Sequence, residues 1–535
     1  MLEIRNSVPA DMTSALYQGE RRRAWLVALT LIFISLVVFA FNAHNGIGIF
    51  TDSTRYMGIS ARPYDAPVYH WMLTGGQALG LELTTAAAIV AVAAIVANVG
   101  LIFALIQRTT GDWRYSAMGT ALIAFSPQFV TLHSGAMSEP PFLSFLLLTI
   151  WQALNYFETG SRRSLLLCSA FLGIATLTRF PGPALGAAIA AVILLDQRLT
   201  IRRRWTDVIL LAAVGGAIFF AWVIDSQLTE GRSIGRTLWF YGTMGPEEWW
   251  DSLRSMLAWI LPDKFGVGLR SVILAGLLLF AGWQEGRQYN RFRRADQPAL
   301  LEARSALQIV LALFFVLYMG FMVLSTSIEA NLSLTGRYAF PAYVILVMLL
   351  TTQTHELSKT VQPERWMRVA LIALAAIILV GHGIRTAART SEVYQEGFGY
   401  QSDMWRTSPT VRALNILPPN VKIYSNGPDI IAYLTGREAE FSPHELMLRT
   451  NEPEPGNPLS KQFARIRAEA AKHPVYIVMF DNVDWRFYLA SDKKIRAGLP
   501  LTLVAKPDDG RIYRVDPPSS AHQPGSADPA PEAKK

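Results

Sequence analysis

The stretch "AWLVALTLIFISLVVFAF", from Ala24 to Phe41, carries no charged residue over its whole length. A helix needs about 20 mostly apolar residues to cross the hydrocarbon core of a bilayer. Similar runs recur through the first 384 residues. Of all 535 residues 51% are hydrophobic and only 17% are charged, whereas soluble domains carry about a quarter charged residues. The sequence therefore predicts a polytopic helical membrane protein.

Eleven spanning helices are predicted from the apolar runs. They are placed at residues 24–41, 84–106, 116–132, 141–157, 164–178, 182–195, 207–224, 269–283, 305–324, 338–351 and 367–384. The pair 164–178 and 182–195 is short, and only "RFPG" separates its two members. A different count for this pair would reverse the orientation of the later loops.

The basic residues of the short loops set the orientation, because cytoplasmic loops carry an excess of Lys and Arg. With the N-terminus in the cytoplasm, the inner side collects Arg21–Arg23, Arg108, Arg114, Arg162, Arg163, Arg198, Arg202–Arg204, the loop "RQYNRFRR", Lys359, Arg365 and Arg368. Fewer basic residues remain for the outer loops. This bias accounts for the net charge of +8 through basic loops facing anionic lipid, without nucleic acid as a partner.

Two features suit an uncleaved protein of the inner (plasma) membrane. Phe41 is followed by "NAHNG" rather than by a small-residue cleavage site, so the first apolar run is expected to stay as an anchor. The single cysteine, Cys168, lies inside a predicted span, so we expect neither an intramolecular disulfide nor a cysteine-based metal site.

The chain after Ile384 has the mixed composition of a soluble domain, and an odd number of spans places it outside the cytoplasm, in the periplasm. Residues 1–384 form the predicted transmembrane domain, 385–515 a small extracytoplasmic α/β domain and 516–535 a disordered tail. Buried strands are expected at Val421–Asn426 and Val475–Phe480, helices at "GPDIIAYLTG" and "KQFARIRAEAAKH", and a hairpin at "LTLVAKPDDGRIYRV".

One of two long outer loops contains an amphipathic segment, "EEWWDSLRSMLAWILP". Its apolar residues share one face at helical spacing: Trp249, Trp250, Leu253, Met256, Leu257, Ile260 and Leu261. Because tryptophan favours the headgroup level, we expect a helix lying on the outer leaflet. A helix packed against the bundle is an equal alternative, and both descriptions can hold together.

Two carboxylates lie at predicted helix ends on the outer side of the membrane. Asp52 belongs to the other long loop, in "FTDSTRYMGISARPYDAPVYHWML" (Phe50–Leu73), and Glu139 belongs to "SGAMSEPPF". Taken alone, Asp52 can be an ordinary solvated loop charge. Together, two carboxylates at equivalent depth suit proton removal from an acceptor hydroxyl beside a lipid-borne donor.

Four segments in order carry a resemblance to a known family. They are "TDSTRYMGISARPYDAPVYHWML", "SEPPFLSFLLLTIWQALNYFE", "GIATLTRFPGPALG" and "LTGRYAFPAYVILV". The chain resembles the membrane-embedded GT-C glycosyltransferases, in the branch of the protein O-mannosyltransferases and the aminoarabinose transferase of lipid A. The resemblance implies a sugar donor linked to dolichyl or polyprenyl phosphate, and an acceptor that is a lipid, a glycan or a protein.

The resemblance also implies roles for single residues. Asp52 matches the first-loop acidic residue of the family, a catalytic base or acceptor-orienting group, and Glu139 matches a second acidic residue ahead of a span. Arg179 and Arg337 match arginines that face the lipid phosphate, although arginines at this depth also reach ordinary lipid headgroups. The family often has two adjacent acidic residues where this chain has Asp52 followed by Ser53, which leaves the acceptor class open.

Tyr56, Tyr69 and His70 are candidates for the wall of the sugar pocket, as is Tyr64. An interfacial belt of aromatic side chains would supply similar residues. The sequence therefore supports both interpretations of these positions.

The expected reaction is direct inverting transfer at the outer face of the membrane, with no cofactor and no need of a metal. A metal ion held by Asp52 and Glu139 is left open as an alternative. Asp52 takes the proton of the acceptor hydroxyl, and an arginine stabilises the departing lipid phosphate. Alternatives from other classes are a multipass transporter or flippase of envelope glycolipid precursors and a non-catalytic envelope assembly protein. A transporter would favour internal repeats and charges at the bilayer midplane, whereas the acidic residues here cluster at the outer surface.

Overall fold

The computed structural model describes residues 10–60, 65–231, 239–294, 303–329, 332–357, 365–448 and 450–517. The chain folds as two compact units, Met1–Ser402 and Asp403–Lys535. The first unit is helical, and its last helix, α15 (Arg365–Glu396), continues beyond Ile384. The second unit contains a small sheet with helices. From residue 518 onward the predicted tail lies outside the described residues.

A helix is present at each predicted span. The long helices of the first unit are α1 (Ala10–Asn42), α4 (Leu83–Thr110), α7 (Glu139–Thr159), α8 (Arg162–Thr178), α9 (Pro183–Leu195), α10 (Ile201–Glu230), α12 (Val267–Arg294), α13 (Ala303–Ile328), α14 (Gly336–Glu356) and α15. The predicted span at 116–132 is instead two helices, α5 (Trp113–Ala124) and α6 (Pro127–His133). The break has a local cause, since Ser126 caps α6 by accepting a hydrogen bond from the Phe129 N–H, and Pro127 begins a helix well.

Six helices of the part of the chain that the structure describes are long and apolar enough to cross a membrane: Gly19–Asn42, Leu83–Thr110, Ile201–Thr229, Val267–Asn290, Ala303–Ile328 and Arg365–Glu396. The helix Pro183–Leu195 is apolar but shorter. The predicted class, a polytopic helical membrane protein, is thus confirmed. The predicted number of eleven spans stays a prediction.

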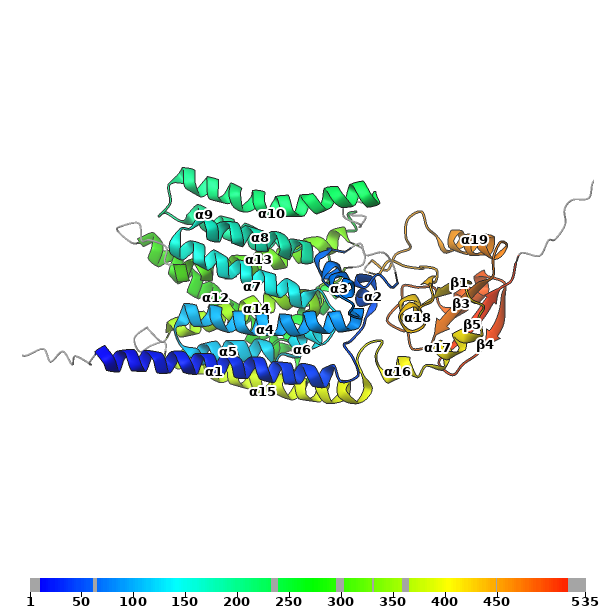
Figure 1. The fold of residues 1–535 in the computed structure, drawn as a ribbon, viewed down its shortest axis with the longest axis horizontal. Coiled ribbons are helices and arrows are strands. Elements are labelled where there is room, and N and C mark those ends of the chain that lie inside the picture. Colours follow the sequence, from blue (N-terminus) through cyan, green and yellow to red (C-terminus); the bar gives the residue numbers. More distant parts are fainter. Residues whose placement is uncertain are drawn as a thin grey trace, which may run out of the picture. The chain divides into compact units, whose positions relative to one another are not determined.

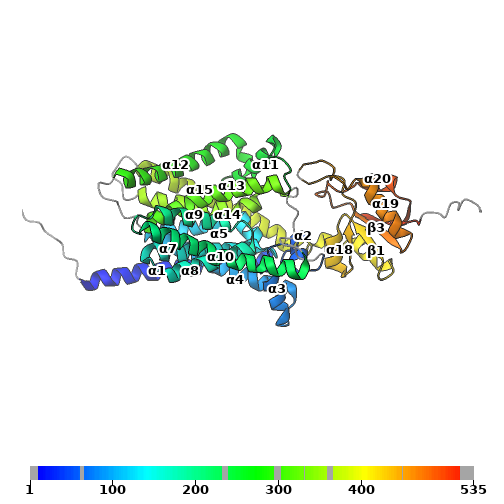
Figure 2. The ribbon, with the colours of Figure 1, turned by 90° about the horizontal axis from the view of Figure 1, so that it is seen from above.

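The helices of the first unit run side by side (Figure 1). α8 packs between α7 and α10, and α13 packs against α9 and α14. α1 pairs with α15 at the opposite side of the bundle from α10. Two short helices, α2 (Thr51–Tyr56) and α3 (Val68–Ala78), lie at the end of the bundle where α4 begins, which is also the end at which α11 (Pro246–Leu257) is found (Figure 2).

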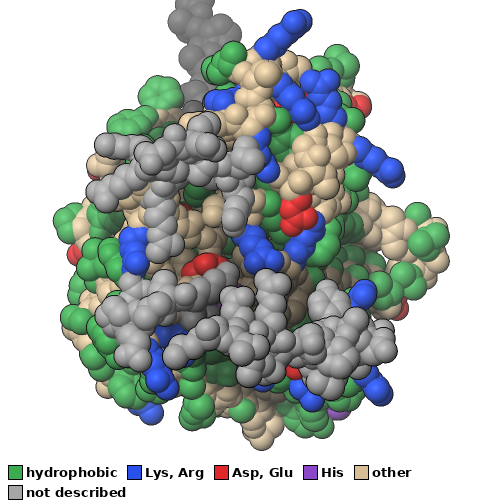
Figure 3. Space-filling model, turned by 90° about the vertical axis from the view of Figure 1, so that its left-hand side faces the viewer, with side chains coloured by type: hydrophobic (Ala, Val, Ile, Leu, Met, Phe, Trp, Pro, Cys, Tyr) green, Lys and Arg blue, Asp and Glu red, His purple; other side chains and the backbone are tan. Residues whose placement is uncertain are grey.

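The other end of the bundle is basic. Figure 3 shows Lys and Arg side chains around the visible part of this end, at which α1 begins. A buried carboxylate joins three helices here: Asp207 of α10 accepts a hydrogen bond of 2.8 Å from the Tyr156 hydroxyl of α7 and pairs with Arg162 of α8 at 3.2 Å. Polar contacts as well as apolar packing therefore hold α7, α8 and α10 together.

The amphipathic segment forms α11, which ends at Leu257, so Ile260 and Leu261 lie in the turn after the helix rather than on its face. The apolar residues of the segment differ in their exposure. Leu257, Ile260 and Leu261 are buried, whereas the Trp249 and Trp250 side chains are exposed. The carbonyl groups that follow the helix are held by α15, because Arg385 donates to the Ala258 oxygen at 2.8 Å and the His382 ring lies 2.9 Å from the Trp259 oxygen. The end of α11 thus packs against the bundle, and its two tryptophans face outward.

The second unit has a five-stranded sheet in the order β2-β1-β3-β5-β4. Its strands are β1 (Lys422–Ser425), β2 (Glu440–Phe441), β3 (Val475–Phe480), β4 (Leu501–Ala505) and β5 (Gly510–Val515). β1 pairs in parallel with β2 and β3, and β5 pairs antiparallel with β3 and β4. The helices are α16 (Asp403–Arg406), α17 (Pro409–Ala413), α18 (Pro428–Thr435), α19 (Leu459–Ala470) and α20 (Asp492–Gly498). The predicted strands, hairpin and two helices are confirmed, while β2, α16, α17 and α20 were not predicted.

Candidate active site

Asp52 is positioned by an extended segment that pairs on two sides. The Gly48 N–H donates to the Ser134 carbonyl at 2.9 Å, and the Tyr400 N–H donates to the Ile49 carbonyl at 2.8 Å. Gly399 permits this approach, because it has a φ of +63° and a Cβ there would lie 2.2 Å from the Ile49 oxygen. α2 follows directly, so Asp52 in its first turn lies at a defined place beside the start of α7.

Glu139 begins α7 and is followed by two prolines that suit the first turn of a helix. A buried network fixes this start. Asn98 of α4 donates to the Pro140 carbonyl at 3.0 Å and accepts from the Ser144 hydroxyl at 2.8 Å. The His133 ring lies 2.9 Å from the same Asn98 amide. Since these groups are paired within the bundle, they position the Glu139 backbone rather than contact a ligand.

Two arginines from distant parts of the chain converge on Glu139. Arg179, at the end of α8, pairs with Glu139 Oε1 at 2.9 Å and donates to the Ser138 hydroxyl at 3.1 Å. Arg337, in the first turn of α14, donates through Nε to the same Oε1. Its Nη1 pairs with Asp52 Oδ2 at 2.7 Å. Arg337 therefore bridges both predicted carboxylates.

A second bridge holds Asp52 from the other side. Arg55, one turn further along α2, pairs with Asp52 Oδ1 at 2.9 Å and donates to both oxygens of Asp65. Three guanidinium groups and three carboxylates thus form one cluster, which we call the ion-pair cluster. Its members are Asp52, Asp65, Glu139, Arg55, Arg179 and Arg337.

The two predicted carboxylates lie at different depths in the ion-pair cluster. The side chain of Asp52 is 19% exposed, whereas that of Glu139 is 2% exposed. The second carboxylate oxygen of Glu139 is buried with no hydrogen-bond partner among the described residues. Burial raises the pKa of Asp52, but the charges of Arg337 and Arg55 outweigh it and hold this pKa well below its usual range. Asp52 is therefore ionised while both arginines remain beside it.

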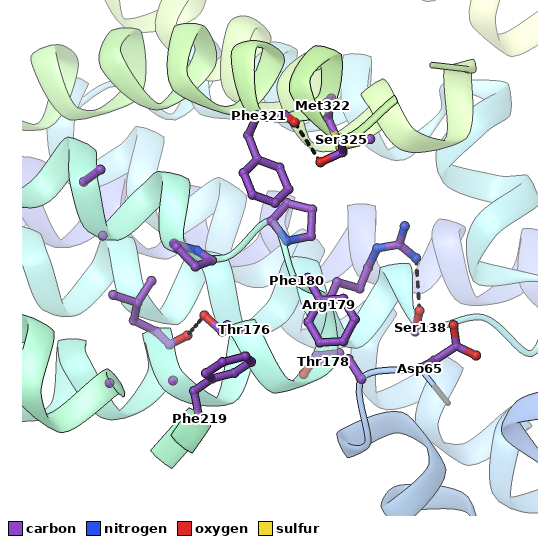
Figure 4. Close-up of a pocket in the computed structure, with 18 of the residues that line it drawn as sticks. Asp65, Ser138, Thr176, Thr178, Arg179, Phe180, Phe219, Phe321, Met322 and Ser325 are labelled. Atoms are coloured by element: carbon purple, nitrogen blue, oxygen red, sulfur yellow. Dashed lines mark hydrogen bonds between the residues drawn. The ribbon is translucent and has the colours of Figure 1, made fainter. Parts of the chain in front are cut away.

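A cavity of about 740 Å³ opens beside the ion-pair cluster. Its polar end is lined by Asp52, Arg55, Asp65, Ser138, Arg179 and Arg337. Its remaining wall is mostly apolar and comes from α8, α9, α10, α13 and the turn between α8 and α9, with Phe180, Ala187, Ala190, Phe219 and Met322 among its residues. Figure 4 shows Arg179 directed to Ser138 at the polar end, with Phe180, Phe219 and Phe321 along the apolar part. A ligand with a charged head and a long apolar tail matches this division.

The predicted aromatic residues are divided between the cavity wall and the packing behind it. Tyr56 lines the cavity, and its hydroxyl lies 3.1 Å from the Ser138 hydroxyl. Tyr69 is fully buried and packs edge to face against Tyr56, with ring centres 5.3 Å apart. His70 holds the Tyr56 carbonyl at 2.7 Å. Neither Tyr69 nor His70 lines the cavity, and Tyr64 lies outside the described residues.

The sequence did not single out four residues that the structure places in the site: Arg55, Asp65, Ser138 and Tyr338. Tyr338 lies under both arginines, with its ring centre 5.3 Å from the Arg179 guanidinium carbon and 5.5 Å from that of Arg337. The spacing of Asp52 and Arg55, three residues apart on a short helix, is a signal that could have identified Arg55. Within the described ranges, no group of three or more His, Cys, Asp and Glu side chains is arranged to hold a metal ion.

The chain resembles known proteins in part of its sequence and in its fold. Residues 62–224 match the family model described as dolichyl-phosphate-mannose-protein mannosyltransferase. No curated protein matches the chain by sequence.

Solved structures share the architecture over most of the chain. ArnT from Cupriavidus metallidurans in the apo state is 14% identical with a TM-score of 0.56, and covers 92% of this chain and 98% of its own. The same protein bound to undecaprenyl phosphate is 12% identical with a TM-score of 0.54 and the same coverage. The archaeal oligosaccharyltransferase AglB from Archaeoglobus fulgidus, in complex with an inhibitory peptide and a dolichol-phosphate, is 12% identical with a TM-score of 0.51, and covers 93% of this chain and 75% of its own. These likenesses confirm the resemblance that the four motifs indicated: the chain is a multi-pass membrane protein with the fold of the GT-C glycosyltransferases.

Proposed function

We propose that the protein is a glycosyltransferase that moves a sugar from a polyprenyl-phosphate donor to an acceptor hydroxyl at the outer face of the cytoplasmic membrane. The observation that carries this proposal is the cavity, in which an arginine-rich polar end is continuous with an apolar wall between membrane helices. The fold adds support, because the solved relatives with the same fold include one bound to undecaprenyl phosphate and one in complex with a dolichol-phosphate.

The donor is bound at its two chemically different ends. Arg179 and Arg337 line the polar end and present planar guanidinium groups, which match the geometry of phosphate oxygens. The apolar wall takes the first isoprene units of the lipid, and their burial there contributes about 25 cal/mol for each Å² removed from water. The phosphate is thereby fixed beside Asp52.

The transfer is a single displacement with inversion at the anomeric carbon. The acceptor oxygen forms a bond to that carbon while the bond from the carbon to the phosphate oxygen breaks. The acceptor proton passes to the Asp52 carboxylate, and the electron pair of the broken bond stays on the lipid phosphate, which the arginines stabilise. Asp52 is suited to this step because, of the two predicted carboxylates, it is the one that lines the cavity.

Glu139 acts as a positioning residue in this proposal. Its Oε1 accepts contacts from both Arg179 and Arg337, and its side chain is buried behind them. Leaving two guanidinium groups in the interior without a carboxylate is costly. Glu139 therefore aligns the arginines for the phosphate.

The proposal gives the two units a place in the cell envelope. The basic end of the bundle faces the cytoplasm, the ion-pair cluster faces the outer leaflet and the α/β unit lies in the periplasm. The transferred group is a hexosyl or pentosyl residue, and the acceptor is a lipid, a glycan or a protein. Tyr56 is placed to contact the sugar.

The test is a transfer assay with the full chain in membranes and labelled polyprenyl-phosphate sugars of several kinds. We expect wild-type membranes to transfer label from at least one donor and Asp52→Asn membranes to lose the transfer by about 100-fold or more. Glu82→Gln is the matched control, because Glu82 is an exposed carboxylate at the start of α4, at the same end of the bundle, and does not line the cavity. Equal transfer by the wild type and Asp52→Asn would remove Asp52 from the reaction.

A further inference from the structure

The arginines that are proposed to bind the phosphate are already paired with carboxylates in the ion-pair cluster. Arg337 reaches Asp52 with Nη1 and Glu139 with Nε. Arg55 reaches Asp52 and Asp65. Three positive groups thus meet three negative groups, so the cluster is neutral before a donor arrives. A phosphate that enters the cluster must therefore replace a carboxylate as the acceptor of hydrogen bonds from an arginine.

The carboxylates differ in how easily a ligand can replace them. Asp52 and Arg337 both line the cavity, and their side chains are 19% and 23% exposed. Glu139 does not line the cavity, and its side chain lies on the buried side of Arg337. A phosphate coming from the cavity therefore meets the contact of Arg337 with Asp52 before the contact with Glu139.

We propose that Asp52 competes with the donor phosphate for Arg337, and that donor binding exchanges the Arg337 contact from Asp52 to phosphate while Glu139 keeps its own contact. This inference rests on the proposed function, since it takes the lipid phosphate as the ligand. It assigns Asp52 a second role, as the occupant of the phosphate position in the empty enzyme. It also assigns Arg55 as a positioning residue, because Arg55 is anchored by Asp65 and continues to hold Asp52 after the exchange.

The exchange links binding to chemistry. An aspartate paired with two guanidinium groups is a weak base, because both charges favour its ionised form. Loss of the Arg337 contact removes one of them and makes Asp52 a better proton acceptor. Asp52 thus becomes a stronger base only when the donor is bound beside it. This favours proton uptake during transfer over proton uptake in the empty enzyme.

The test measures binding of undecaprenyl phosphate, the expected product lipid, to the full chain in nanodiscs. We expect Asp52→Asn to bind it more tightly than the wild type by roughly 3- to 10-fold, although the variant does not transfer sugar. Glu139→Gln should bind it more weakly by about 10-fold, since the arginines lose their anchor. The charge-matched control Glu82→Gln should stay within about 2-fold of the wild type, because Glu82 is exposed at the start of α4 and does not line the cavity.

The outcomes separate the exchange from the function. If the wild type binds undecaprenyl phosphate and Asp52→Asn binds it equally or more weakly, the exchange is wrong while the proposed function stands. Equal tightening by Asp52→Asn and Glu82→Gln would show a general effect of charge and would also overturn the exchange. If the wild type binds no polyprenyl phosphate, the proposed function itself fails. Should Glu139→Gln not fold, the comparison of Asp52→Asn with Glu82→Gln still decides.

Discussion

Arg337 is placed where its charge needs compensation. It lies in the first turn of α14, and the partial positive charge of a helix N-terminus disfavours a cation there. Asp52 and Glu139 offset this cost, and the ring of Tyr338 lies beside the guanidinium. A phosphate can therefore serve as the negatively charged partner of Arg337 as well as a carboxylate can.

Replacing Arg337 by Lys tests whether its shape matters. Arg337→Lys keeps the charge but loses the fork of donors that reaches two partners at once. We expect the KM for the lipid donor to rise by about 10-fold, because roughly one charge-assisted hydrogen bond is lost. Steady-state transfer at varied donor concentration measures this. An unchanged KM would mean that Arg337 does not hold the donor.

The pH dependence of transfer tests the state of Asp52. Burial raises the pKa of Asp52 and the two arginines lower it further than burial raises it, so the free enzyme keeps this carboxylate ionised at pH 5 to 8, about the usual working range. The ratio kcat/KM of the wild type should therefore show no loss from Asp52 protonation as pH falls through that range. Arg337→Gln removes one lowering charge, so its acid limb should move to higher pH. The same acid limb in both proteins would contradict the assignment.

At the residue scale the sequence singled out four of the six members of the ion-pair cluster, and their roles stay predictions. Asp52, Glu139, Arg179 and Arg337 lie far apart in the chain, and the structure brings them together. That Glu139 lies behind the arginines could not be predicted, since depth in a cluster depends on how α7, α8 and α14 pack. Asp65 was quoted in the first loop, but its bond to Arg55 joins residues ten positions apart, so the local pattern does not predict it.

At the scale of elements, the close contact of α8 and α10 shapes one side of the cavity. A Cβ on Gly173 would lie 3.1 Å from the Gly215 oxygen, and the Ser169 hydroxyl of α8 bonds to the Leu211 carbonyl of α10. Small residues also line the neighbouring face of α9, where Ala187 and Ala190 border the cavity. Space for a lipid chain beside these helices follows from the small size of Gly173, Ala187 and Ala190 in the cavity wall.

Filling this part of the cavity should alter the use of the donor lipid. Ala190→Phe places a ring in the apolar end of the cavity, so transfer from a long polyprenyl donor should fall by about 10-fold or more, while a donor with a short isoprenoid tail is less affected. Transfer rates with donors of two chain lengths measure the effect. Ala191→Phe is the control, because Ala191 is partly exposed on the same helix and does not line the cavity. Equal losses with both donors would place the lipid tail elsewhere.

In the α/β unit, Asp509 ties the start of the unit to the turn between β4 and β5. It accepts hydrogen bonds from the Ser408 hydroxyl, the Thr410 hydroxyl and, at 2.8 Å, the Thr410 N–H. Asp509→Ala should expose the amides around α17 to faster hydrogen exchange, with a local loss of about 1–3 kcal/mol. Hydrogen exchange of the full chain checks this against Asp508→Ala. Equal protection in both variants would show that Asp509 contributes little.

Elements with strong periodicity were predicted well, and short ones were not. The positions of the long apolar helices and of β1 and β3 could be predicted from runs of apolar residues in the sequence, because a buried segment is built mainly from apolar side chains. The break between α5 and α6 needed the capping bond of Ser126, and β2 has only two residues, whose pairing depends on β1. Local sequence does not determine such contacts.

For the whole molecule, the membrane character and the fold agree with the four motifs from which the resemblance was inferred. Composition predicted the membrane class, and the order of the motifs predicted the GT-C fold, which the solved relatives share. The number of membrane crossings is a different matter, since six helices of the described part meet the length and hydropathy of a span while others are shorter or less apolar. Packed helices inside a bundle need not be long and uniformly apolar, so hydropathy alone does not count them.

The central claim is that the cavity holds the phosphate of a lipid-linked sugar at the ion-pair cluster. Its most direct test is an experimental structure of the full chain with an unreactive polyprenyl-phosphonate sugar bound in nanodiscs. We predict the phosphonate within hydrogen-bond reach of Arg337, about 3 Å, with its anomeric carbon beside Asp52 and its lipid tail along α8, α9 and α10. A lipid phosphonate bound outside this cavity, with Asp52 and Arg337 still paired and out of its reach, would contradict the account.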